Sequence, residues 1–119
     1  MAVPDISNTL AQMNHESKFI NGLRYTDEIT ITVAQMVLAG KVNKDLVKLI
    51  EKNGGKAIGL SGIDGSLIKA KKLTNDIDLG FVGEITSVNT ELLNLSMNSG
   101  YIPVVSSIAI GEMILIVIT

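Results

Sequence analysis

The sequence predicts an α/β fold in which helices cover an open, mostly parallel sheet. Helical patterns alternate with short aliphatic segments along the 119 residues, apolar residues make up 46% of the chain, and aromatic residues make up 3%. An aliphatic composition of this kind is typical of parallel strands that helices bury on both faces. The length suits one domain, and the chain shows neither an internal repeat nor a linker. Residues 1–119 are therefore expected to form a single domain.

The composition excludes several classes of function. Ten basic and twelve acidic residues leave a net charge of -2, which provides no basic surface for nucleic acid or an anionic membrane. The absence of cysteine excludes disulfides and fits a reducing cytosol. The start of the chain lacks a signal-peptide pattern, and the longest apolar run, residues 113–118, is far shorter than the roughly 20 residues that span a bilayer. We therefore expect a cytoplasmic protein that binds neither nucleic acid nor membranes.

The first predicted elements are a short helix and a hairpin. Apolar residues at helical spacing predict a helix over residues 6–13. Residues 18–24 are expected to form a strand or half of a hairpin. The turn is placed at Asn21 and Gly22, because an Asn-Gly pair favours the positive φ angles of a tight turn.

A long helix is expected next, over about residues 27–52, with Thr26 as its N-cap. Taken alone, residues 29–33 alternate like a strand and are rich in β-branched side chains, but residues 34–39 favour a helix. The helix should end at residues 53–55, where glycine can supply a left-handed cap. Its apolar residues form two sets, so one flank should lie on the sheet while the other can meet a partner subunit. The sets are Ile29, Val33, Met36, Val37 and Gly40 on one face, and Ile31, Ala34, Leu38, Val42 and Leu49 on the other.

The second half of the chain predicts strands and one further helix. A turn rich in glycine and aspartate, residues 62–65, joins the first two strands. Asn89 is the expected N-cap of the helix, and Gly100 is its stop. Continuous aliphatic runs indicate that the last two strands are buried. The predicted strands span residues 56–61, 66–73, 79–86, 102–106 and 113–118, and the helix spans residues 89–98.

Arg24 is the strongest candidate for a functional residue. It lies just after the glycine-containing turn and directly ahead of the predicted long helix. A guanidinium there can hold a carboxylate with two parallel hydrogen bonds, and the helix start adds positive potential for an anion. The residues alone leave a plainer alternative open, in which the hairpin is exposed and Arg24 pairs with a neighbouring acid.

Other motifs that could carry chemistry are incomplete. Residues 54–57 resemble a phosphate-binding loop but lack its first glycine and the hydroxyl residue that would hold magnesium, so a helix C-cap explains them better. Residues 59–62 lack the final glycine of a nucleophile elbow. The single histidine, His15, excludes histidine-based triads and metal clusters and is expected at a surface helix end. We therefore expect no catalytic residue and no metal ligand in this chain.

Five collinear segments between about Ser17 and Ile110 resemble the N-acetyl-L-glutamate kinases, which have the amino-acid kinase fold. That resemblance implies a three-layer α/β/α architecture. It also implies an enzyme of arginine biosynthesis that uses ATP and Mg²⁺ to phosphorylate the side-chain carboxylate of N-acetyl-L-glutamate. The segments are residues 19–27, 36–44, 59–65, 78–84 and 100–106.

The resemblance also assigns roles to individual residues. Arg24 corresponds to the arginine that grips a substrate carboxylate, while Asn21, Gly22 and Leu23 correspond to the lid over the substrate. The helix over residues 27–52 corresponds to the one through which family members form homodimers.

The sequence departs from the family at both ends. The family's first strand, its lysine and its glycine-rich turns have no counterpart ahead of Pro4 in the given sequence, and residues 1–119 do not include the family's ATP-binding lobe. The resemblance therefore implies an incomplete domain whose own residues bind neither ATP nor Mg²⁺ and which is inactive when isolated. The alternative is a non-catalytic dimerisation or ligand-binding remnant.

The join at Glu112 and Met113 makes a structural prediction. In the family, the strands over residues 102–106 and 113–118 are parallel neighbours. Here residues 107–112 alone lie between them, which is too short for a parallel crossover. We therefore expect either an interruption between Ile110 and Ile114 or, in a continuous chain, an antiparallel hairpin.

Overall fold

A computed structural model describes residues 3–73, 77–112 and 114–118 of the protein. Its elements, in chain order, are α1 (Val3–Gln12), β1 (Lys18–Ile20), β2 (Leu23–Tyr25), α2 (Glu28–Gln35), the π-helix η1 (Met36–Val42), α3 (Asn43–Lys52), β3 (Ala57–Ser61), the 3₁₀-helix η2 (Asp64–Ser66), β4 (Ile68–Lys72), β5 (Val82–Val88), α4 (Thr90–Asn98), β6 (Ile102–Ser106), β7 (Ile108–Gly111) and β8 (Ile114–Ile118).

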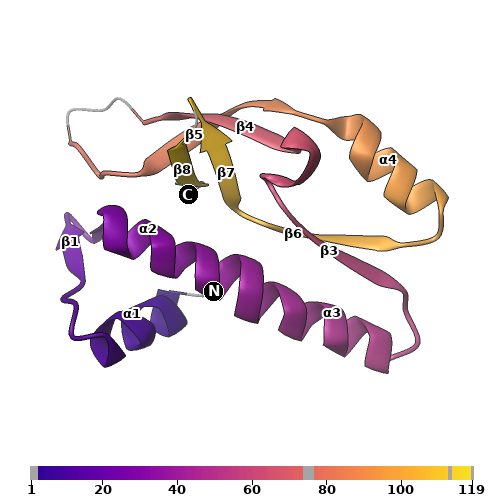
Figure 1. The fold of residues 1–119 in the computed structure, drawn as a ribbon, viewed down its shortest axis with the longest axis horizontal. Helices are drawn as coiled ribbons and strands as arrows, with labels where there is room; N and C mark the ends of the chain where they lie inside the picture. Colours follow the sequence, from indigo (N-terminus) through magenta and orange to yellow (C-terminus); the bar gives the residue numbers. More distant parts are fainter. Residues whose placement is uncertain (1–2, 74–76, 113, 119) are drawn as a thin grey trace.

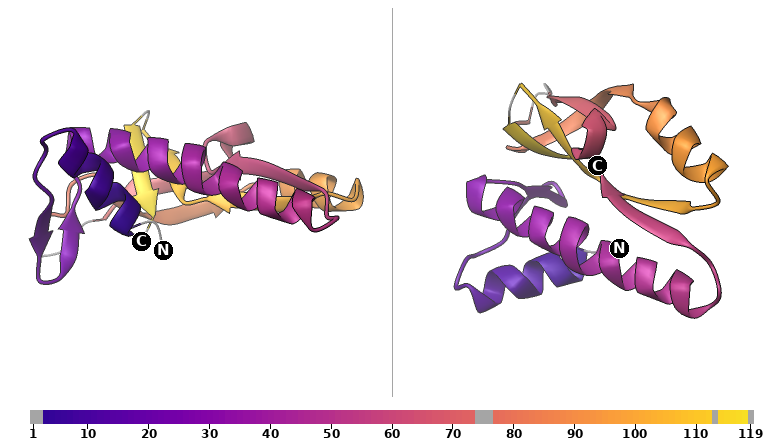
Figure 2. Two further views of the ribbon diagram at one scale, coloured as in Figure 1. Left: turned by 90° about the horizontal axis from the view of Figure 1, so that it is seen from below. Right: turned by 45° about the vertical axis from the view of Figure 1, so that its right-hand side comes forward.

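The elements are arranged in layers, which confirms the predicted α/β class. Helices α2, η1 and α3 follow one another without a break and run along one side of the strands, with α1 beside them (Figure 1). The pair β3–β6 lies between α3 and α4, which cover its opposite sides (Figures 1 and 2). The hairpin β1–β2 lies at the start of the long helix (Figure 1).

Burial in the core explains why the strand-like part of the long helix is helical. Ile31, Val33, Ala34 and Val37 are buried together with side chains of α1 and β7. A strand would point Val33 and Ala34 to opposite faces, whereas the helix brings them into one core. The sequence left open which of the two apolar sets faces the sheet. The core takes members of both sets, Ile31 and Ala34 from one and Val33 and Val37 from the other.

The two ends of the long helix differ in how well they were predicted. Its N-cap is Asp27, whose side chain accepts a hydrogen bond from the backbone N–H of Thr30 at 2.8 Å. The prediction of Thr26 was therefore wrong by one residue, because Thr26 is held in a bridge to another segment. At the other end, Gly54 has φ +90°, which confirms the glycine cap.

The sheets combine parallel and antiparallel pairs. Strands β3 and β6 are parallel, with Ala57 opposite Ile102 and Ser61 opposite Ser106. The other large sheet has the order β4-β5-β8-β7 and closes on itself through the pair Lys69–Ile110. This sheet is mixed and closed, in contrast to the open, mostly parallel sheet that was predicted. Its antiparallel pairs follow from connections that are too short to carry a strand back to a parallel position.

The C-terminal end contains a strand that was not predicted. β7 pairs with β8 in an antiparallel hairpin that places Gly111 opposite Ile114, while β6 pairs with β3. The predicted strand over residues 113–118 is thus β8, which is not a neighbour of β6. The sequence predicts an antiparallel hairpin if the chain is continuous. β8 does form such a hairpin, but with β7 and not with β6. Met113 itself lies outside the described residues.

Two further boundaries were corrected. β5 begins at Val82, because Leu79 and Phe81 instead bond to the backbone of Thr26. Asn89 occupies the N-cap position of α4 as predicted, but its side chain makes no cap. The amide of Asn89 donates instead to the carbonyl of Gly65 at 3.0 Å.

Candidate functional site

The hairpin β1–β2 carries the residues predicted to bind a ligand. Asn21 and Gly22 form its turn with φ values of +51° and +81°, the combination that a two-residue hairpin turn requires. The strands pair so that Phe19 lies opposite Arg24 and Ile20 lies opposite Leu23. Asn21, Gly22 and Leu23 are exposed. The predicted lid residues therefore form the open tip of the hairpin, and Arg24 lies nearer to its base.

Two hydroxyl groups hold the guanidinium of Arg24. Its Nη2 donates to Ser7 Oγ of α1 at 2.8 Å, and its Nη1 donates to Ser17 Oγ at 3.3 Å. The guanidinium carbon lies 5.0 Å from the centre of the Phe19 ring, a distance that allows a cation–π contact. Burial lowers the pKa of Arg24 from its ordinary value, but a guanidinium remains charged at physiological pH. A half-buried cation with a fixed orientation is well suited to hold a carboxylate.

The base of the hairpin contains a contact that the sequence analysis missed. His15 Nε2 and Asp27 Oδ2 lie 3.0 Å apart, and their side chains are 22% and 31% exposed. His15 was predicted to lie at a surface helix end, whereas it is half-buried against the N-cap of α2. The sequence shows that these two residues flank the predicted hairpin. It does not show that they touch, because their contact forms when the chain folds.

Asp27 also changes the expected electrostatics of the helix start. Burial raises its pKa, but hydrogen bonds from Thr30 and His15 lower it more, so that the pKa of Asp27 lies below its ordinary value. Its carboxylate already takes the free N–H of Thr30. The positive end of α2 is thus partly neutralised by the chain's own acid, and Arg24 is the cation of this site.

A hollow lies on the surface beside the hairpin. It is a shallow, open hollow of about 560 Å³, and its described lining does not include Arg24. The hollow combines aromatic walls with a lysine and a glutamate. It is lined by Glu16, Ser17, Lys18, Phe19, Ile20 and Tyr25.

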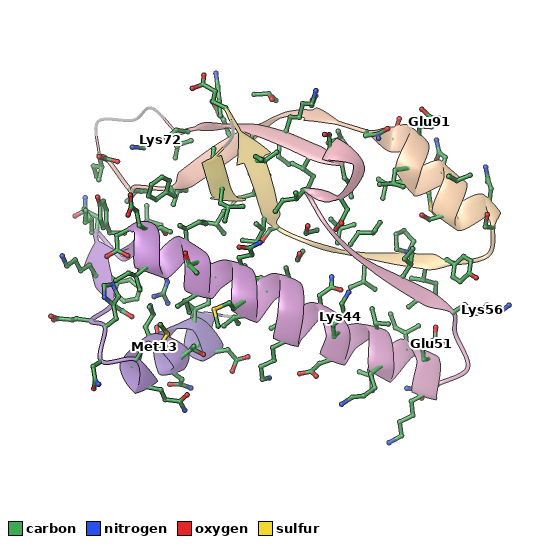
Figure 3. The ribbon with its side chains drawn as sticks, in the orientation of Figure 1. Met13, Lys44, Glu51, Lys56, Lys72 and Glu91 are labelled. Atoms are coloured by element: carbon green, nitrogen blue, oxygen red, sulfur yellow. The ribbon has the colours of Figure 1, made fainter. Side chains whose placement is uncertain are left out.

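A second hollow of about 510 Å³ lies between the long helix and β6. Asn43 is 2% exposed and donates to the carbonyls of Leu60 and Val104 at 3.1 and 2.9 Å. Lys44 points from α3 toward β3, where its Nζ donates to Asn43 Oδ1 and to the carbonyl of Gly59 (Figure 3). This polar junction fastens the helix to both strands. The hollow is lined by Asp5, Leu38, Val42, Asn43, Leu46, Val104, Val105, Ser106 and Ser107.

The described ranges contain no group of three or more histidine, cysteine, aspartate or glutamate residues that could hold a metal ion. Within the same ranges, no helix is long and apolar enough to cross a membrane. Residues 54–57, the incomplete phosphate loop, follow the end of α3 at Lys52 and lead into β3, which begins at Ala57.

Comparison with known sequences gives a consistent result. The sequence profile of the amino acid kinase family matches residues 5–116. The acetylglutamate kinase of Clostridium beijerinckii is 71% identical over 109 residues, and that of Clostridium kluyveri is 63% identical over the same length. Each alignment covers 92% of this chain and 38% of the relative. The chain therefore spans well under half the length of these relatives.

Solved structures share the fold at low sequence identity. The protein smu.665 from Streptococcus mutans superposes with a TM-score of 0.85 at 23% identity, covering 95% of this chain and 46% of that protein. The N-acetylglutamate synthase of Neisseria gonorrhoeae, solved with coenzyme A and N-acetyl-glutamate, has a TM-score of 0.74 at 18% identity. That alignment covers 98% of this chain and 27% of the synthase. At these identities the likeness supports the fold.

Proposed function

The chain belongs to the amino acid kinase family, and from this premise we propose that it is the N-acetyl-L-glutamate-binding part of an acetylglutamate kinase. The parent reaction transfers the γ-phosphoryl group of ATP to the side-chain carboxylate of N-acetyl-L-glutamate. The single observation that carries the proposal is the 71% identity to the acetylglutamate kinase of Clostridium beijerinckii. Such an enzyme of arginine biosynthesis would work in the cytoplasm.

Arg24 is the proposed anchor of the substrate. In this role its guanidinium binds a carboxylate of N-acetyl-L-glutamate. That substrate carries no positive charge of its own, so no other cation on it competes with Arg24 for the carboxylate. The hydroxyl groups of Ser7 and Ser17 fix the guanidinium, so that less conformational entropy is lost when the ligand binds. Asn21, Gly22 and Leu23 would then close over the substrate, because their turn lies at the free tip of the same hairpin.

The phosphoryl-transfer groups are assigned to other parts of a complete kinase. ATP and Mg²⁺ supply the phosphoryl group and neutralise its developing charge. The described part of the chain has no acidic cluster that fits a magnesium ion. Its glycine-containing turn at residues 54–57 serves as a helix cap. The isolated chain is therefore proposed to hold substrate without transferring phosphate.

A chimeric enzyme tests this function. Residues 5–112 of this chain would replace the aligned segment of the Clostridium beijerinckii kinase, and phosphorylation of N-acetyl-L-glutamate would be measured. The chimera should be active. Arg24→Ala should raise KM for N-acetyl-L-glutamate strongly, since loss of a buried charge-assisted pair costs about 2–5 kcal/mol, and KM for ATP should stay nearly unchanged. An Arg24→Ala chimera with unaltered acetylglutamate kinetics would refute the assignment.

A non-catalytic module for dimerisation is the second candidate. Apolar side chains remain exposed along the long helix, and such a surface favours association with another copy. In this case the chimera would be inactive although the chain folds and self-associates. The exposed side chains are Ile29, Met36, Leu46 and Leu49.

A further inference from the structure

The outer edge of β3, away from β6, is closed by charged side chains of the same chain. Lys44 and Glu51 extend from α3 toward this strand (Figure 3). Side-chain cover of this kind stops a further strand from pairing with a sheet edge. Three backbone groups of β3 are bonded in this way: the N–H of Ala57 to Glu51 Oε2 at 2.6 Å, the carbonyl of Gly59 to Lys44 Nζ at 3.3 Å, and the N–H of Ser61 to Asp64 Oδ2 at 2.7 Å.

The outer edge of β6 is open. The backbone N–H of Ile102 donates to the carbonyl of Lys56, just before β3, at 2.7 Å. Because successive residues of a strand direct their backbone groups to alternate sides, Pro103 and Val105 direct theirs away from β3. Pro103 has no N–H, which a strand tolerates on an unpaired edge. In the described part of the chain β6 pairs with β3 alone, so the N–H of Val105 faces no paired strand.

The hollow between the long helix and β6 lies beside this open edge. Its helical wall contains Leu38, Val42 and Leu46, and Val105 lines it from β6. The side chains of Leu46 and Val105 are 45% and 39% exposed, which leaves apolar surface in contact with water. A strand placed along β6 would bury this surface, and such burial is favourable. The strand should itself be aliphatic, because one of its faces lies against a helix.

The handedness of crossovers places a neighbour at the same edge. Connections between parallel strands are right-handed in nearly all proteins, so crossovers on opposite faces of a sheet run in opposite directions across it. α4 connects β3 to β6 on one face, whereas the long helix leads into β3 on the other (Figures 1 and 2). A parallel strand that reaches β3 through the long helix therefore lies beyond β6, next to its open edge.

The start of α1 lies where such a strand would end. Asp5, in the first turn of α1, lines the hollow together with Ser106 and Ser107. Ser106 is the last residue of β6. A strand that leads directly into α1 would thus end beside the carboxyl end of β6, which makes it run parallel to β6. The position of α1 and the handedness of the crossovers agree on the same neighbour.

We propose that the open edge of β6 binds a parallel, aliphatic β-strand that precedes α1 in a complete kinase, and that the chain binds this strand even as a separate peptide. The proposal rests on the proposed function, because it takes the chain as part of a longer enzyme; the chain covers 38% of its Clostridium beijerinckii relative. Backbone hydrogen bonds to β6 supply the affinity, and side chains that fill the hollow supply the specificity.

Hydrogen exchange of the full 119-residue chain tests the proposal with a synthetic peptide. The peptide carries about ten residues, a length that suits one strand, taken from directly ahead of the segment of the Clostridium beijerinckii kinase that aligns with α1. Without the peptide, the amide of Val105 should exchange readily. Saturating peptide should raise its protection at least about tenfold, because this amide then donates to the added strand. The amides of Ala57 and Ser61, on the closed edge, are the internal control and should not change.

A pair of variants tests the side-chain contacts. Val105→Glu should weaken peptide binding at least about tenfold, because the peptide would bury a carboxylate without a partner. Ile58→Glu is the matched control: Ile58 on β3 is 37% exposed and is not part of the described lining of the hollow. Its substitution should change the affinity less than about twofold. If Val105→Glu does not fold, the exchange of Val105 in the unaltered chain decides.

The outcomes separate this inference from the proposed function. A Val105 amide that is as protected as those of α3 in the free chain, or that does not respond to the peptide, would overturn the proposal. Protection that rises with the concentration of the chain alone would show that a second copy occupies the edge, which also overturns it. If the peptide protects Val105 but the Arg24→Ala chimera keeps unaltered acetylglutamate kinetics, the docking edge stands and the substrate assignment fails.

Discussion

The side-chain amide of Asn43 donates to the backbone carbonyl of Val104 at 2.9 Å, across 61 positions of sequence. A second hydrogen bond of the same amide reaches Leu60 on the neighbouring parallel strand. One buried side chain thus connects the long helix to both strands of the β3–β6 pair. The helix turns from π to α geometry at this residue, and the junction holds the register between the two layers.

Asn43→Leu should lower the free energy of unfolding by about 2–4 kcal/mol, because the half-buried residues Leu60 and Val104 each lose a hydrogen-bond donor to their carbonyl. Urea unfolding followed by circular dichroism would measure the change. Asn94→Leu is the matched control: Asn94 is exposed on α4, so its substitution should change the stability by less than about 0.5 kcal/mol. Equal stabilities of the two variants would contradict the role of the junction.

Gly80→Ala should be strongly destabilising. Gly80 has φ +78°, and a Cβ at this position would collide with the backbone carbonyl of Thr26. Strain and displacement of the bridge should together cost about 3 kcal/mol or more. Gly40→Ala is a suitable control, because no atom lies near a Cβ built there and alanine favours a helix. The urea midpoint should fall for Gly80→Ala and stay level or rise for Gly40→Ala.

Local sequence signals predicted the hairpin well. Asn21 and Gly22 determine its turn, and the turn sets the register that places Arg24 opposite Phe19. The contact of His15 with Asp27 could not be predicted, because it joins residues on either side of that hairpin after folding. The buried role of Asn43 was missed for the same reason, although asparagine is a poor residue for a helix interior. β7 was missed because its residues continue the aliphatic pattern of β6.

Acidification should destabilise the protein partly through Asp27. The pKa of Asp27 is lowered in the folded state, so its stabilising contribution is present above the unfolded-state pKa and is lost as the pH falls through the folded-state value. Urea midpoints at neutral pH and below about pH 4 would show the loss. Asp27→Asn retains a cap and should flatten this acid-side decline, whereas Asp27→Ala should be less stable already at neutral pH. An unchanged decline in Asp27→Asn would argue against this contribution.

The exposed apolar side chains of the long helix predict self-association. Met36 is 56% exposed, and Ile29, seven positions earlier, is exposed on a similar face of the helix. Burial of such side chains between two copies removes apolar surface from water, and a two-fold dimer would place the same face on both partners. Light scattering at micromolar concentration should therefore give the mass of a dimer.

Met36→Glu should shift the dimer to a monomer, because a carboxylate cannot be buried there without a partner. Leu95 on α4 is 63% exposed, and Leu95→Glu is the matched control, which should remain dimeric. A monomeric unaltered chain, or equal dissociation by both substitutions, would show that this helix is not the dimer interface.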